Sequence, residues 1–199
     1  FTIYMNNKRK MSYVTDKNLK VGIVGLGTIG STLAQHLDDG IDGLSLSSVA
    51  VGDPNTNYPI LKNLKVVPNI VNFEEMSAST DVIVECAPST IFENIALPAI
   101  KAGRIFIPAS VGALLDRLDL IEKSKITGAK IIVPTGALLG LDAVRAASEG
   151  TIHSVQMITR KPPSGLKGAP YLDGKNINLD QLTEPLKLYN GPAREAVRG

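Results

Sequence analysis

Up to Gly150, short apolar runs alternate with segments in which apolar residues recur every three or four positions. The short runs are typical of buried strands, and the wider spacing is typical of amphipathic helices. The pattern predicts strands at 20–24, 44–51, 65–68, 81–86, 104–108 and 129–133. It predicts helices between or after these strands, at 29–39, 72–76, 89–102, 116–127 and 138–148. This alternation predicts an α/β fold, a parallel sheet with crossover helices.

The pattern loosens after Gly150. We expect a strand, a Pro- and Gly-rich loop, one helical turn, a second strand and the start of a helix, over 151–159, 160–171, 179–182, 186–189 and 193–198. This mixture predicts an α+β domain, and so short a segment buries little core of its own. The last helical pattern stops at Gly199 and the chain starts at Phe1, so we expect a truncated sequence.

The first strand leads directly into a Gly-x-Gly-x-x-Gly sequence, with glycines at 25, 27 and 30, and a helical pattern follows. A dinucleotide site needs this order: a tight turn, a close approach of the backbone to a pyrophosphate, and close packing of helix and strand. The helix N-terminus then presents free N–H groups to the phosphates. The candidate cofactor residues here are Gly25, Gly27, Thr28, Ile29 and Gly30. The alternative is a glycine-rich turn that binds nothing.

With the alternating strands, this loop predicts a Rossmann-type doubly wound parallel sheet. We divide the chain into a polar N-terminal extension over 1–18, a dinucleotide-binding domain over 19–137 and an incomplete α+β substrate and dimerisation domain over 138–199. The extension lacks apolar patterning, so we expect it to be poorly ordered.

Asp53 closes the second predicted strand, 23 residues after Gly30. An acidic side chain there accepts hydrogen bonds from the hydroxyls of an adenosine ribose and repels a 2′-phosphate. No Arg or Lys lies between Asp53 and Ile60, so the sequence favours NAD over NADP, with NADP still possible. The alternative is that Asp53 only forms the turn in Gly-Asp-Pro-Asn.

The loops after the later strands carry small and hydroxyl residues. Ala87 and Pro88 follow the fourth strand and leave space for a nicotinamide ribose. Two similar loops, 108–115 and 134–142, each place a hydroxyl residue before Gly-Ala. Backbone N–H groups in such loops suit a carboxylate or the nicotinamide amide. Further candidates are therefore Ala87, Pro88 and Ser110 for the cofactor and Gly112 and Gly136 for the substrate.

Other reactive side chains give weaker signals. Arg160 and Lys161 form a pair suited to a dicarboxylate, although a solvated loop would look the same. Cys86 has no histidine near it in sequence, so we interpret it as a small hydrophobic residue. His36 falls on the outer face of the first helix and His153 inside a predicted strand, so neither is assigned a catalytic role. No Cys/His spacing indicates a metal site.

Composition narrows the class of protein. The 199 residues carry 21 basic and 19 acidic side chains, a net charge of +2, without the clustered basic residues of a nucleic-acid-binding surface. No apolar run approaches the roughly 20 residues that span a bilayer. A single cysteine excludes an intramolecular disulfide and fits a cytoplasmic protein. We therefore expect no nucleic-acid partner and no membrane insertion.

These loops, with several segments beyond them, resemble L-aspartate dehydrogenase. The similarity runs in order from about Leu19 to Gly199, through the glycine loop and the segments 84–88, 110–114, 136–144, 150–155, 159–163, 182–186 and 191–196. The segments from Ser110 onward are more specific than the glycine spacing.

The resemblance implies NAD(P)-dependent oxidative deamination of L-aspartate to oxaloacetate and ammonia through iminoaspartate, in support of NAD biosynthesis, by a homodimer. It also implies that Ala137 lies in a loop that contacts the nicotinamide cofactor. The family's catalytic histidine and a second cofactor-contacting asparagine lie beyond Gly199. We therefore assign no catalytic residue and expect these 199 residues alone to be inactive.

Two other functions remain open. One is a related oxidoreductase of the homoserine dehydrogenase or dihydrodipicolinate reductase type, against which the paired Gly-Ala-Leu loops argue. The other is a nucleotide-binding protein without turnover.

Overall fold

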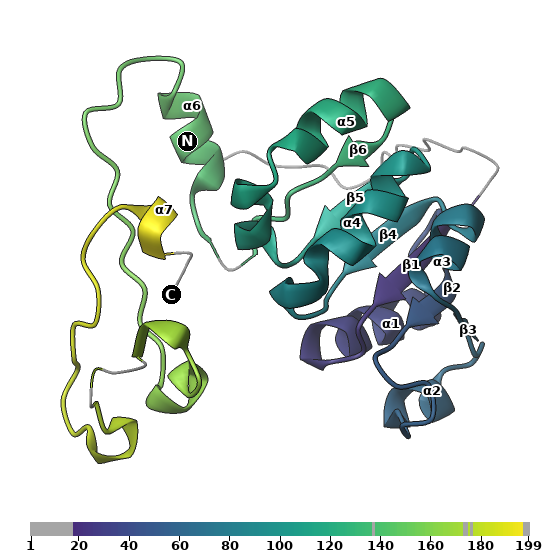
Figure 1. Ribbon diagram of the computed structural model, residues 1–199, viewed down its shortest axis with the longest axis horizontal. Helices are drawn as coiled ribbons and strands as arrows, with labels where there is room; N and C mark the ends of the chain where they lie inside the picture. Colours follow the sequence, from purple (N-terminus) through teal and green to yellow (C-terminus); the bar gives the residue numbers. More distant parts are fainter. Residues whose placement is uncertain (1–17, 137, 173–174, 176, 197–199) are drawn as a thin grey trace, which may run out of the picture. The chain divides into compact units, whose positions relative to one another are not determined.

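The computed structural model describes residues 18–136, 138–172, 175 and 177–196 (Figure 1). Except for Asn18, the predicted N-terminal extension lies outside the described residues, and so does Ala137. The chain separates into two compact units, Phe1–Pro134 and Thr135–Gly199.

A six-stranded sheet forms the centre of the first unit, and every pair of neighbouring strands is parallel. The strands are β1 (Leu19–Val24), β2 (Leu44–Ala50), β3 (Asn69–Ile70), β4 (Val82–Glu85), β5 (Ile105–Pro108) and β6 (Lys130–Ile131). Their order is β3-β2-β1-β4-β5-β6, so the direction of winding reverses between β1 and β4. This is the order of a doubly wound sheet with two mononucleotide-binding halves. The predicted Rossmann-type α/β fold is confirmed.

The carboxyl ends of the central strands are level with one another. Val24, the last residue of β1, pairs with Ala50 of β2 on one side and with Glu85 of β4 on the other. Glu85 in turn pairs with Pro108 at the end of β5. The loops after these four strands therefore begin next to one another, at the edge of the sheet where doubly wound folds bind ligands.

Helices cover both faces of the sheet (Figure 1). They are α1 (Thr28–Gly40), α2 (Pro59–Asn63), α3 (Phe73–Ser79), α4 (Phe92–Lys101) and α5 (Asp119–Thr127). Apolar residues of α1 and α2 form one core with one face of the strands, and those of α3, α4 and α5 form a second core with the other. Strands buried on both faces explain the nearly continuous apolar runs in the sequence.

The second core is packed around an aromatic pair. Phe92 of α4 and Phe106 of β5 meet edge to face, with ring centroids 5.8 Å apart. Both rings are buried, and the neighbouring Ile95 and Ile100 of α4 are also buried. This contact fixes α4 against the sheet and thus fixes the loop between β4 and α4.

The region around β3 differs from the sequence prediction. A strand was predicted at 65–68, but β3 is Asn69–Ile70. The carboxylate of Asp38 accepts hydrogen bonds from the N–H groups of Lys65 (2.9 Å) and Val66 (3.2 Å), which are then unavailable for a strand ladder. Helix α2, in a segment without clear pattern, was not predicted.

The start of α3 agrees with the sequence. Asn72 was predicted as its cap, and the Asn72 side chain accepts a hydrogen bond from the N–H of Glu75 at 2.8 Å. The Glu75 carboxylate accepts one from the N–H of Asn72 at 3.1 Å, which completes a capping box. The helix continues to Ser79, three residues beyond the predicted end.

The second unit is made of short elements. They are α6 (Leu141–Ala147), α7 (Ala193–Ala196) and the 3-10 turns η3 (Pro163–Leu166), η4 (Pro170–Leu172) and η5 (Leu179–Gln181). The predicted helical turn at 179–182 and the helix start at 193 are confirmed. The predicted strands at 151–159 and 186–189 are wrong: neither segment pairs with another described segment. A strand needs a neighbour for its backbone groups, and Val155 and Met157 are each 63% exposed.

Candidate cofactor site

The glycine loop joins β1 to α1, and its first glycine is required by the backbone. Gly25 has a φ of +89°, which side chains other than glycine rarely adopt. A Cβ there would also lie 2.6 Å from the carbonyl oxygen of Cys86. The N–H of Gly25 donates to the carbonyl of Ala50 at 2.8 Å. The turn is therefore held between the ends of β2 and β4.

The other two glycines differ in what surrounds them. A Cβ at Gly30 would overlap the carbonyl oxygen of Gly25, so α1 reaches the loop only because this side chain is absent. At Gly27 no described atom lies within 4 Å of a Cβ position, and its φ of −73° suits any residue. Nothing in the described protein requires glycine at position 27. The open space above Gly27 fits a ligand that approaches the backbone closely.

The first turn of α1 faces this open space. Gly27 is the N-cap, no side chain caps the helix, and Thr28 and Ile29 are exposed. The N-terminus of a 13-residue helix carries unpaired N–H groups and a partial positive charge. Of the predicted residues, Gly27, Thr28 and Ile29 thus form an exposed surface suited to an anion, whereas Gly25 is half-buried and Gly30 is buried.

Asp53 lies in the loop after β2 and forms a turn. Its Oδ1 accepts a hydrogen bond from the N–H of Asn55 at 2.9 Å, and its Oδ2 accepts one from the hydroxyl of Thr56 at 3.2 Å. The Asn55 bond, followed by the Thr56 bond, lowers the pKa of Asp53 below its ordinary value. Each carboxylate oxygen can accept a second bond. Asp53 therefore does form the turn, and its two carboxylate oxygens can still accept hydrogen bonds from ribose hydroxyls.

The loops after β4 and β5 are joined by a side chain that the sequence reasoning did not single out. Glu85, at the end of β4, is fully buried. Its carboxyl group accepts hydrogen bonds from the N–H of Ala87 (2.8 Å) and from the N–H and hydroxyl of Ser110 (2.9 and 3.0 Å). The structure thus brings the predicted residues Ala87 and Ser110 together. An acidic residue at the end of an apolar strand was the available signal.

These bonds also limit what the two loops can donate. The N–H groups of Ala87 and Ser110 both point to Glu85, so neither is free for the nicotinamide amide. The Ser110 hydroxyl lies 3.0 Å from the carbonyl oxygen of Ala87 as well as from Glu85. Ala87, the exposed Pro88 and Ser110 can therefore shape a cofactor site, with these two N–H groups already engaged.

Cys86 is half-buried beside the first core. Burial, and then the negative charge of Glu85, raise the pKa of the Cys86 thiol to about 11. A neutral thiol is a poor nucleophile, which agrees with the interpretation of Cys86 as a packing residue. His36 is exposed on α1 and His153 is exposed in irregular chain. Within the described residues, no group of three acidic, Cys or His side chains could hold a metal ion.

The remaining candidates are placed as follows. Gly112 lies in the 3-10 turn η2 (Val111–Asp116) of the first unit and is half-buried. In the second unit, Gly136 has a φ of +58° and is exposed. Arg160 and Lys161 are exposed in irregular chain before η3, and neither forms an ion pair with another described residue.

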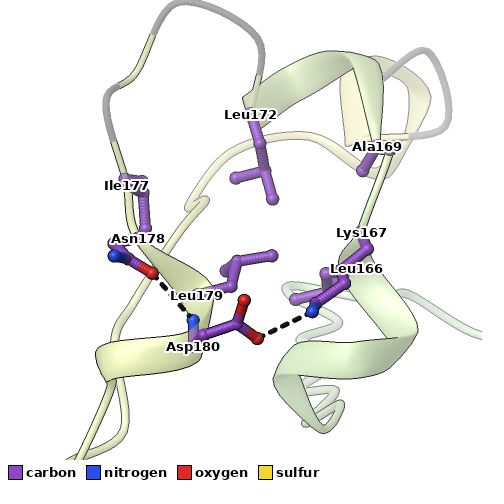
Figure 2. A pocket seen from close by; sticks show the side chains of 9 residues that line it. Leu166, Lys167, Ala169, Leu172, Ile177, Asn178, Leu179 and Asp180 are labelled. Carbon is purple, nitrogen blue, oxygen red and sulfur yellow. Dashed lines mark hydrogen bonds and ion pairs between the residues drawn. The ribbon is translucent and has the colours of Figure 1, made fainter.

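The second unit also contains a pocket between η3, η4 and η5 (Figure 2). Leu166, Leu172 and Leu179 line it, and an ion pair of 2.7 Å between Lys167 and Asp180 crosses its edge. The nine residues that line it include none of the predicted site residues. Among the described residues of the whole chain, no helix is both long and apolar enough to cross a bilayer.

Comparison with known proteins defines the class and then the family. Residues 25–134 match the family model "Homoserine dehydrogenase, NAD binding domain", and residues 142–199 match "Aspartate dehydrogenase, C-terminal". With the strand order and the glycine loop, the first match makes the chain an NAD-binding oxidoreductase of Rossmann type. The chain belongs to the L-aspartate dehydrogenase family, as its relatives show.

L-aspartate dehydrogenase of Bradyrhizobium diazoefficiens is 49% identical over 96% of this chain, which spans 69% of that protein. L-aspartate dehydrogenase 3 of Bordetella bronchiseptica is 46% identical over 92% of this chain and 68% of its own length. L-aspartate dehydrogenase of Methanocella arvoryzae is 35% identical over 90% of this chain and 67% of its own length. The resemblance seen in the loop sequences is confirmed.

Solved structures agree on the fold. A probable dehydrogenase from Thermotoga maritima has a TM-score of 0.54 and 19% identity, over 66% of this chain and 41% of its own. The scyllo-inositol dehydrogenase of Lactobacillus casei with bound NAD(H) has a TM-score of 0.52 and 20% identity, over 67% of this chain and 41% of its own.

Proposed function

We propose that the protein containing this chain catalyses NAD(P)-dependent oxidative deamination of L-aspartate, giving oxaloacetate and ammonia through iminoaspartate. The observation that carries the proposal is the match to L-aspartate dehydrogenases along 96% of the chain, across both units. The iminoaspartate would supply NAD biosynthesis.

The first unit would hold the cofactor. The pyrophosphate would lie over Gly27 and the N-terminus of α1, where the structure leaves room for it. Asp53 would accept the adenosine ribose hydroxyls, which favours NAD over NADP. The loops with Ala87, Pro88 and Ser110 would border the nicotinamide half. When bound, the cofactor takes up a hydride from the substrate.

The second unit would contribute the substrate side. Arg160 and Lys161 are exposed cations suited to the two carboxylates of aspartate. Gly136 of the second unit and Gly112 of the first would approach the substrate through backbone groups, and Ala137 would approach the cofactor. We assign residues 19–137 to the dinucleotide-binding domain and 138–199 to part of a catalytic and dimerisation domain, in a cytoplasmic homodimer.

The chemistry defines what is still to be located. A hydride leaves Cα only from the neutral amine, so a base that titrates near neutral pH must accept a proton, and histidine suits this role. His36 is exposed on α1 and His153 is exposed in irregular chain, so we assign neither of them. The residues of this chain would bind and orient cofactor and substrate, which accounts for much of the rate in such reactions.

The test is an NADH absorbance assay on the intact protein with L-aspartate and either NAD or NADP. We expect reduction with L-aspartate, faster with NAD, and none with D-aspartate. L-Homoserine must also be tested as a substrate in this assay, because residues 25–134 match a homoserine dehydrogenase domain. Turnover of homoserine alone would replace the proposal, and cofactor binding without turnover would favour a non-catalytic nucleotide-binding protein.

A further inference from the structure

Glu85 is the only buried charged side chain among the described residues, and it lies at the carboxyl end of β4. Burial of a carboxyl group is costly unless hydrogen-bond donors surround it. Three donors do so, at 2.8, 2.9 and 3.0 Å, and they come from two residues, Ala87 and Ser110. Both carboxyl oxygens of Glu85 thus accept hydrogen bonds, so the fold provides a specific site for this buried side chain.

The bonds of Glu85 connect two loops that are separate in sequence. Ala87 follows β4, whereas Ser110 follows β5 and lies 25 positions after Glu85. The backbone continues the connection, because the N–H of Ala109 donates to the carbonyl of Glu85 at 2.8 Å. A Cβ on Gly25 would lie 3.2 Å from the nitrogen of Ala87, so the glycine loop lies directly against this assembly. One side chain therefore sets the relative position of the loops after β4 and β5, beside the loop after β1.

We propose that Glu85 is a positioning residue that fixes the nicotinamide end of the cofactor site. The proposal rests on the proposed function, in which the glycine loop and the β2 end take the adenosine half. In a doubly wound sheet the second half, β4 to β6, takes the other mononucleotide. Glu85 is itself fully buried, so it acts through Ala87 and Ser110 and does not touch the ligand.

Glu85→Gln tests this role with little change of volume. Backbone N–H groups only donate, so each needs a carboxyl oxygen. Oε1 accepts from Ala87 and Oε2 from Ser110. In glutamine one of the two oxygens is replaced by an NH2 group. In either orientation of the side chain, the N–H of Ala87 or of Ser110 then faces this NH2 donor and loses its acceptor. The substitution therefore releases one loop and leaves the glycine loop and Asp53 intact.

The measurement is the Kd of NADH and of ADP-ribose, which lacks the nicotinamide, for the intact protein and its variants. For Glu85→Gln we expect the Kd of NADH to rise about tenfold, with ADP-ribose changed less than about twofold. Ser110→Ala, which removes one of three bonds, should raise the Kd of NADH about threefold. Ser77→Ala is the matched control, because Ser77 is also buried but its hydroxyl has no partner in the described structure.

Two results would overturn the inference. One is an equal loss of NADH and ADP-ribose affinity, which would mean that Glu85 only stabilises the fold. The other is unchanged NADH affinity in Glu85→Gln and Ser110→Ala. If Glu85→Gln does not fold, Ser110→Ala against Ser77→Ala decides the question. Failure of the proposed function is a different result: wild-type protein that binds both ligands and does not oxidise aspartate leaves the NADH and ADP-ribose comparison valid.

Discussion

Gly30 and Gly25 touch across the turn between β1 and α1: a side-chain carbon on Gly30 would overlap the carbonyl oxygen of Gly25. Gly27, between them in sequence, has no such neighbour. The glycine pattern thus contains two structural requirements and one that the described protein does not explain. A ligand bound over the loop, as we propose, would account for the third, and the difference can be measured.

Gly27→Ala should separate binding from folding. The free energy of unfolding should change by less than about 1 kcal/mol, since a methyl group meets nothing there. NAD affinity should fall about tenfold to a hundredfold, because the pyrophosphate loses charged hydrogen bonds to the loop. Gly30→Ala is the control and should destabilise the protein by about 1–3 kcal/mol. Denaturant unfolding and calorimetric titration measure both effects; unchanged NAD affinity in Gly27→Ala would place the pyrophosphate elsewhere.

Asp53→Ala tests the choice between NAD and NADP. We expect NAD affinity to fall about tenfold while NADP affinity falls less, because the repulsion of a 2′-phosphate is also removed. Thr56→Val is the matched variant: it removes one bond of the turn and keeps the carboxylate. Kd values for both cofactors provide the readout. Parallel losses of NAD and NADP in Asp53→Ala would show that the residue only forms the turn.

The pH dependence of NAD binding follows from the lowered pKa of Asp53. A carboxyl whose pKa is lowered stays ionised through the ordinary titration range of aspartate and loses its charge only as the pH falls through the lowered value. The contribution of Asp53 to NAD affinity should therefore be constant from neutral pH down to the ordinary pKa of aspartate, whereas NADP affinity should also change at about pH 6, where its 2′-phosphate gains a proton. Titrations of NAD into the wild type and Asp53→Ala at several pH values measure the contribution; a difference between the two proteins that disappears near neutral pH would point to another group.

Sequence patterns predicted what depends on neighbours in the chain. The glycine loop, the Asn72 cap and β4 follow from short runs of residue types. The failures involve distant partners: Asp38 shifts β3 along the sequence by taking two N–H groups, and the segment 151–159 has no strand to pair with among the described residues. Glu85 was missed for the same reason, because its partner Ser110 is far away in sequence.

The Cys86 thiol should be unreactive in the folded protein. Its pKa rises from 9.0 to about 11, so alkylation at pH 8 should be about a hundredfold slower than in the unfolded chain. Because the folded state holds this proton more tightly, the linked stability is complete below pH 9 and is lost as the pH rises toward 11. Mass spectrometry of the Cys86 peptide after timed iodoacetamide treatment gives the rates, with urea-unfolded protein as reference. Rapid labelling at pH 8 would restore the nucleophile as a candidate.

Gly22, in the middle of β1, leaves space for the side chain of Met76 on α3. A Cβ on Gly22 would lie 2.7 Å from both Cγ and Sδ of Met76, so Gly22→Ala should destabilise the protein by about 1–3 kcal/mol. Met76→Ala should cost about 2–5 kcal/mol through the cavity that it leaves. The double variant should lose less than the sum, because each change relieves the other.

Denaturant unfolding of the two single variants and the double variant measures this coupling. Gly52→Ala is the control, since a methyl group there meets no atom within 4 Å, and it should stay within about 0.5 kcal/mol of the wild type. Additive losses in the double variant would mean that the cost of Gly22→Ala does not come from contact with the Met76 side chain. Gly22 lies in β1, and the glycine loop follows directly after this strand. If the variants change the free energy of unfolding and leave NAD affinity unchanged, β1 tolerates strain at its centre without displacing Gly25.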